Sequence, residues 1–130
     1  MIVIDASATV EMLLATEAGL RIAARALESK VVLHAPHLLD VEVAHVLRRL
    51  VRTKIIDADR AEAAFANFVG LRVTRHAHLL LLPRVWELRH TVSAYDATYV
   101  SLAETLGVPL LTRDDRLAGA HGHRARLEVI

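Results

Sequence analysis

Four acidic residues stand where neighbouring elements of the chain could bring carboxylates together. Asp5 directly follows a short apolar run, and Asp114 follows a second one. Glu42 and Asp96 each lie in the first turns of a predicted helix. Carboxylates gathered at one place repel one another, so they resist ionisation unless a cation neutralises them. Their hard oxygen atoms are the ligands that Mg²⁺ or Mn²⁺ requires.

A site of this kind would support phosphodiester hydrolysis. Two metal ions about 3.5–4 Å apart would activate a water molecule and stabilise the leaving oxygen. Asp96 could instead belong only to a capping box, Glu42 could be a partner of the helix dipole, and Asp114 could cap a short helix. Asp5 is harder to explain in this way, because a carboxylate that ends an apolar strand should be partly buried. Spacing alone leaves both interpretations open.

The elements that would position these acids follow from the apolar pattern. Continuous apolar runs predict strands at 2–4, 31–33, 71–74, 108–112 and 127–130. Helical spacing predicts helices over 8–14, about 20–27, 38–52, 57–68 and 93–106, with a short one after Asp114. Ser7 is the predicted N-cap of the first helix, and Phe65 is expected to face the core from the fourth. Pro83 must kink or start a further helix within 77–90.

This alternation predicts a single α/β domain over residues 1–130, with three α/β/α layers and a mainly parallel central sheet. Ligands of such sheets bind beyond the carboxyl ends of the strands. That rule selects Asp5, the segment 112–115 and the loop before Leu38 as places to look for function.

Composition excludes several classes of protein. A hydrophobic fraction of 54% and a mean hydropathy of +0.35 exclude a disordered chain, and 24% charged residues exclude a membrane bundle. No apolar run approaches the ~18 residues of a membrane span, and the first residues do not resemble a signal peptide. The chain has no cysteine, which excludes disulfides, thiol nucleophiles and cysteine-held metals. We expect a cytoplasmic protein.

Four segments carry a resemblance to a known family. They are Ile-Val-Ile-Asp-Ala-Ser at 2–7, Ala-Pro-His-Leu-Leu-Asp-Val-Glu-Val at 35–43, Tyr-Asp-Ala-Thr-Tyr-Val at 95–100 and Leu-Leu-Thr-Arg-Asp at 110–114. In this order the chain resembles the PIN-domain ribonucleases, and more narrowly the VapC toxins of bacterial toxin–antitoxin pairs. The match covers essentially the whole chain, and four motifs together are far more specific than any one of them.

The resemblance implies a set of site residues. The metal-binding quartet would be Asp5, Glu42, Asp96 and Asp114, and the hydroxyl positions near the metals would be Ser7 and Thr112. His45 stands where the family often has Asn, and its imidazole could still hydrogen-bond a carboxylate or a water. Asp115 could share the role of its neighbour, although the Thr-x-Asp pattern favours Asp114.

The resemblance also implies an activity and its partners. The reaction would be Mg²⁺-dependent hydrolysis of cellular RNA such as tRNA or rRNA, with Mn²⁺ as a possible substitute, and its result would be arrest of translation. An antitoxin protein would cover a groove between the helices at 8–27 and 38–51. A homodimer is implied, whereas a membrane and a small-molecule cofactor are not.

Charge agrees with an RNA substrate. If metals neutralise the quartet, sixteen Lys and Arg face eleven of the fifteen acidic residues, enough to attract a phosphate backbone. The arginines nearest the predicted site are Arg113 and Arg116, with Arg72 and Arg75 farther away. A dehalogenase-like phosphatase would need a second Asp at position 7, where Ser7 stands. The main alternative is a catalytically silent PIN-like domain that binds RNA or protein.

Overall fold

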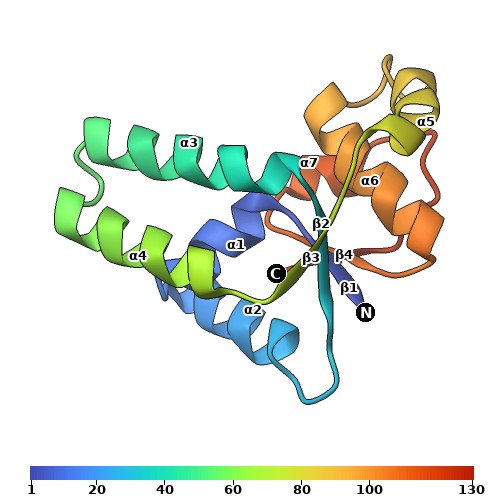
Figure 1. Cartoon of the computed structure of the whole chain (residues 1–130). Coiled ribbons are helices and arrows are strands. Elements are labelled where there is room, and N and C mark those ends of the chain that lie inside the picture. The colour runs from blue at the N-terminus through green and yellow to red at the C-terminus, as the bar shows by residue number, and fades with distance from the viewer.

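A central sheet of five parallel strands organises the protein (Figure 1), and the computed structural model describes all residues 1–130. The strands lie in the order β3-β2-β1-β4-β5. Their bounds are β1 Ile2–Ile4, β2 Leu33–Pro36, β3 Val73–His76, β4 Leu110–Thr112 and β5 Leu127–Val129. The predicted α/β class with a parallel sheet is therefore confirmed.

Seven helices and one 3₁₀ turn surround the sheet. They are α1 Ala6–Leu13, α2 Glu17–Ala26, α3 Leu38–Arg52, α4 Ala58–Gly70, the turn η1 Leu79–Leu81, α5 Leu82–Glu87, α6 Ala94–Leu106 and α7 Asp115–Ala118. Figure 1 shows α3 and α4 side by side, reaching away from the sheet, while α5 and α6 lie close together at the opposite side of the view. Pro83 stands in the first turn of α5, which begins there without a kink.

The central strands are buried on both faces, which explains their unbroken apolar runs. Val3 and Leu110 point into a core shared with α3, α5 and α6. Ile2, Ile4 and Leu111 point the other way, into a smaller core closed by α2. Strand alternation thus builds the two interfaces of a three-layer domain.

Several predicted features need correction, among them the fourth strand, which begins at Leu110 instead of residue 108. Asp5, not Ser7, is the N-cap of α1, because its carboxylate accepts the Ala8 N–H at 2.8 Å directly after the strand. The second strand runs over 33–36 instead of 31–33. Pro36 is tolerated there because it lies beyond the last β1 pair and has only His76 of β3 as a partner.

The third strand begins at Val73, two residues later than predicted, in register with Leu33 of β2. Phe65 does not face the core as predicted, since 42% of it is exposed. The helix α4 packs along α3 away from the sheet, so only the narrow stripe with Ala64 and Phe68 is buried.

Candidate active site

The order of the strands reverses at β1: the chain adds β2 and β3 on one side of it and β4 and β5 on the other. Asp5 directly follows β1, Thr112 is the last residue of β4, and Asp114 lies two residues further on. In open parallel sheets this switch point leaves a crevice beyond the carboxyl ends of the two strands. The fold therefore places two of the predicted acids at the position where such sheets bind ligands.

All four predicted carboxylates line one open cavity of about 600 Å³ there. They come from four segments: Asp5 from the end of β1, Glu42 from α3, Asp96 from α6 and Asp114 from the start of α7. Ser7 lines the same cavity. Residues more than a hundred positions apart in the chain thus line one cavity.

Asp5 is the most enclosed of the four, with only 8% of the residue exposed. Burial raises the pKa of its carboxyl group, because a charge is less stable away from water. Hydrogen bonds from Ala8 N–H and from the Thr112 and Ser7 hydroxyls oppose this shift, and the negative charge of Asp96 adds to it. Burial therefore disfavours the ionised form of this carboxyl group.

The two predicted hydroxyl residues connect the ends of β1 and β4. Ser7 Oγ donates to Asp5 Oδ1 at 2.7 Å and lies 3.5 Å from Thr112 Oγ1. Ser7 Oγ also accepts the Arg113 N–H at 3.0 Å, and Thr112 Oγ1 accepts the Asp114 N–H at 3.0 Å. These bonds fix the backbone of both acidic strand ends relative to each other.

Tyr99 is a site residue that sequence reasoning missed. Its hydroxyl donates to Glu42 Oε2 at 2.5 Å. Burial, followed by this bond to Glu42, raises the pKa of Tyr99 far above its usual range, so the hydroxyl stays a donor. Tyr99 lies three residues after Asp96 on α6, and this i, i+3 spacing is the signal that could have identified it.

Glu42 is half-buried beneath this hydroxyl. Burial raises the pKa of Glu42, and the charges of Asp5 and Asp96 act in the same direction. The hydrogen bond from Tyr99 and the proximity of His45 lower it. The opposing effects show that the three carboxylates share one electrostatic environment.

Asp96 and Asp114 also have the structural roles considered above. Ser93 Oγ donates to Asp96 Oδ2 at 2.9 Å and accepts the Asp96 N–H at 3.1 Å, which is a capping box. Asp114 caps α7 through the Arg116 N–H and pairs with the Arg116 guanidinium at 3.1 Å. The Arg116 guanidinium lowers the pKa of Asp114. Asp115 is exposed on α7 and does not line the cavity.

As they stand, the side chains form no group of three or more His, Asp or Glu residues placed to hold a metal ion. The chemistry of the donors nevertheless fits Mg²⁺, since four carboxylates face one cavity and two of them, Asp5 and Glu42, have raised pKa values. Binding a cation would require small movements of side chains, including the release of Asp114 from Arg116.

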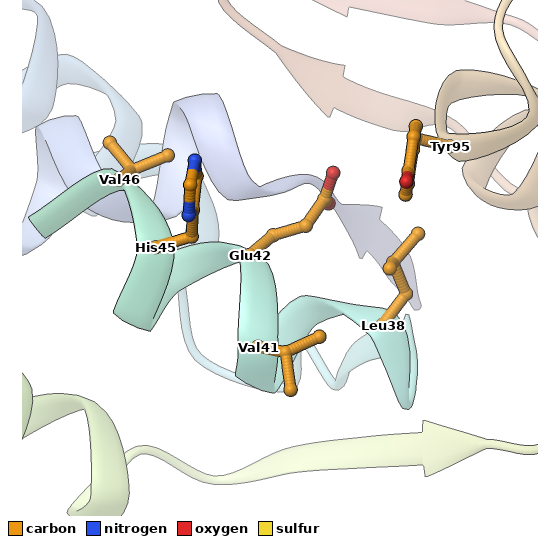
Figure 2. A pocket seen from close by; sticks show the side chains of 6 residues that line it. All are labelled: Leu38, Val41, Glu42, His45, Val46 and Tyr95. Atoms are coloured by element: carbon orange, nitrogen blue, oxygen red, sulfur yellow. The ribbon is translucent and has the colours of Figure 1, made fainter. Parts of the chain in front are cut away.

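A second hollow, about 490 Å³, opens beside Glu42 between α3 and α6. Figure 2 shows Glu42 and His45 rising from the same side of α3, with Tyr95 facing Leu38 across the gap. His45 is exposed, so its imidazole is accessible next to the carboxylate cavity.

The predicted arginines divide into two groups. Arg113 and Arg116 line the carboxylate cavity, but the first bonds the Ile130 carbonyl and the second pairs with Asp114. Arg75 pairs with Asp40 at 2.8 Å, and Arg72 precedes β3, at the opposite end of the sheet.

Two further arginines, Arg49 and Arg60, also line the carboxylate cavity. The sequence did not assign either of them to the site.

Comparison with known proteins shows the family of this chain. The PIN domain family matches residues 2–121. The chain is 44% identical over 130 residues to ribonuclease VapC12 of Mycobacterium tuberculosis, covering all of this chain and 99% of that protein. This chain belongs to the VapC family of PIN-domain ribonucleases. Among its VapC relatives, VapC1 of the same organism is 43% identical over 129 residues, covering 98% of this chain and 96% of that one.

Solved structures share the VapC fold of this chain. PAE2754 from Pyrobaculum aerophilum superposes with a TM-score of 0.71 at 21% identity, covering 98% of this chain and 83% of that one. Mycobacterium tuberculosis VapC20, described as a toxin that cleaves the sarcin–ricin loop, gives a TM-score of 0.65 at 23% identity and covers 95% and 97%. None of the helices is long and apolar enough to cross a membrane.

Proposed function

We propose that this VapC-family chain is a Mg²⁺-dependent endoribonuclease, the toxin of a type II toxin–antitoxin pair. The observation that carries the proposal is the convergence of Asp5, Glu42, Asp96 and Asp114 on one cavity at the switch point of the sheet. Its relatives are named ribonucleases, and VapC20 cleaves the sarcin–ricin loop, which favours tRNA or rRNA as the substrate class.

In this mechanism Asp5, Asp96 and Asp114, with Glu42 in support, would hold Mg²⁺, for which Mn²⁺ could substitute. When bound, the metal supplies an activated water and charge stabilisation at the phosphodiester. Ser7 orients the Asp5 carboxylate through its 2.7 Å hydrogen bond and, with Thr112, holds the two strand ends together. Arg116 pairs with Asp114 at 3.1 Å, and once released from this pair its guanidinium would be free to bind a phosphate.

The same proposal includes protein partners. Part of the lining of the carboxylate cavity is apolar: Val10 of α1, Leu14 directly after α1, and Val46 and Leu50 of α3. This apolar lining suits the apolar face of an antitoxin helix, which would cover the site and block RNA. We further propose that the toxin acts in the cytoplasm as a homodimer and stops translation by cutting RNA.

The proposal is tested with purified, antitoxin-free chain and total cellular RNA. We expect discrete cleavage in Mg²⁺, none in EDTA and none with Asp96→Asn. The matched control is Asp59→Asn, which removes an exposed carboxylate from the first turn of α4. Cleavage that survives in folded Asp96→Asn would contradict the assignment of the site.

A catalytically silent domain that binds RNA or protein is the second candidate. Arg116 already forms an ion pair with Asp114, and the side chains form no preformed group of metal ligands. RNA binding by the wild type without cleavage in any lane would favour it.

A further inference from the structure

The exposed face of α3 changes from acidic to basic along its length. His45, Arg49 and Arg52 follow Glu42 at spacings of three and four residues, which places them on the same face of the helix. All three are exposed. We call these three residues the α3 basic stripe.

The stripe is continuous with the carboxylate cavity. Arg49 lines that cavity together with Glu42 and also lines a neighbouring hollow of about 340 Å³. The walls of this second hollow are His45, Arg48, Arg49, Arg52 and Thr53. Arg49 therefore joins the two hollows. A ligand bound against Glu42 can extend along α3 from the first hollow into the second.

The arginines of the stripe have no anionic partner in the protein. Arg116, Arg75 and Arg84 each form an ion pair, whereas Arg49 and Arg52 form none. Glu62 of α4 lies with Arg52 around the groove between α3 and α4 but is not within ion-pair distance. Guanidinium groups left unpaired beside a cavity are suited to bidentate contacts with phosphate.

An RNA strand has a specific need for cations at this place. Its phosphates are repelled by an acidic cavity, so binding requires positive charge within about one Debye length, roughly 8–10 Å. Arg49 lies seven positions after Glu42, which corresponds to a distance of about 10 Å along a helix. The arginines of the stripe therefore begin at a distance where their charge can offset that repulsion.

We propose that the α3 basic stripe binds the phosphates that flank the cleaved bond and so positions single-stranded RNA on the enzyme. The inference rests on the proposed function and adds to it the path of the strand. The stripe residues are positioning residues, and they touch phosphates that do not react. An acidic protein segment is the competing occupant, but it does not need the adjoining carboxylate site.

The experiment compares two double variants of the full chain. Arg49→Gln with Arg52→Gln removes two charges from the stripe. Arg72→Gln with Arg126→Gln removes two exposed charges that precede β3 and β5, at the opposite end of the parallel sheet. Binding of a short labelled single-stranded RNA is measured in EDTA over a range of salt concentrations, and thermal melts verify folding.

We expect the stripe variant to bind about tenfold more weakly, with the salt slope reduced by about 0.7 for each phosphate that is no longer bound. The control variant should match the wild type. In Mg²⁺, the stripe variant should raise KM for long RNA and leave kcat unchanged. Binding in EDTA needs no cleavage, so the stripe and the proposed reaction can fail separately.

Equal RNA affinity and salt slope in the stripe variant and the wild type would overturn the proposal. Equal weakening of both double variants would also overturn it, because only the net charge of the protein would then matter. Loss of binding to an acidic protein, with RNA binding intact, would assign the stripe to that protein instead.

Discussion

Asp5 and Asp114 occupy the same local position in the fold but differ in their electrostatics. Each follows a parallel strand, and each caps the helix that comes next. Burial raises the pKa of Asp5, whereas the Arg116 guanidinium lowers the pKa of Asp114. A shared strand–cap–helix motif therefore sets where a carboxylate stands, while its surroundings decide how readily it ionises.

The difference has a structural cause. Asp5 ends the central strand β1, which helices cover on both faces, and it has no cationic side chain as a partner. Asp114 begins the four-residue helix α7, where the exposed side chain of Arg116 reaches it. Asp5 thus lacks a counter-ion, whereas Asp114 already has one in Arg116, which would have to move away before Asp114 could bind the proposed metal.

The largest expected effect is on catalysis. Asp5→Asn and Asp114→Asn should each lower RNA cleavage by at least about a hundredfold, because each removes a charged ligand of the proposed metal. Both variants should fold, since Asn is a good N-cap. Cleavage rates and thermal melts measure the two effects. Asp115→Asn is the neighbouring control and should cleave like the wild type, whereas a similar loss there would move the ligand role to Asp115.

The second prediction concerns the positioning of Glu42. Tyr99→Phe removes the hydroxyl that orients this carboxylate, and we expect Mn²⁺ affinity to fall about tenfold. Electron paramagnetic resonance of free Mn²⁺ measures it directly. Tyr95→Phe is the matched control on the same helix, because the Tyr95 hydroxyl makes no hydrogen bond to the protein. If folded Tyr99→Phe binds Mn²⁺ with unchanged affinity, the orientation of Glu42 by Tyr99 has no role in metal binding.

The two acids should also differ in their effect on stability as pH changes, measured by denaturation of metal-free protein. The folded pKa of Asp5 is raised, so its charge destabilises the fold as pH rises from the ordinary value of 3.8 through the folded pKa. The folded pKa of Asp114 is lowered, so its stabilisation is present above 3.8 and is lost as pH falls through the folded pKa.

Relative to the wild type, Asp5→Asn should therefore gain stability toward neutral pH, while Asp114→Asn should lose it there and recover in acid. Parallel pH profiles for the two variants would show that burial and pairing do not distinguish these acids.

The smallest expected effect comes from Arg116→Gln. It frees Asp114 from its 3.1 Å ion pair and should slightly tighten Mn²⁺ binding, because the cation no longer competes with Arg116. The pair is exposed on the Arg116 side, so stability should hardly change. The same substitution in an Asp114→Asn background should have no effect on Mn²⁺ affinity, which tests that the two residues are coupled.

Local pattern was sufficient for the order of elements and for the acids that they carry. Continuous apolar runs become buried parallel strands in any register, so Ile2–Ile4 and the strand that ends at Thr112 were predictable. The boundaries of β2 were not predictable. A strand tolerates Pro36 only because this residue lies beyond the last pair with β1, which local sequence does not show. The Phe65 prediction was wrong for a similar reason, since helical spacing does not say how far a helix extends beyond its neighbours.

The sequence by itself determined an α/β chain with acidic residues at the ends of its strands and helices, because apolar periodicity and capping chemistry act over a few residues. Only the tertiary structure decided that the Tyr99 hydroxyl meets Glu42, that Asp5 lacks a counter-ion while Asp114 has one, and that Arg49 opens onto the acidic cavity. Burial and the distances between charges depend on segments that can lie more than a hundred residues apart, and no local pattern records them.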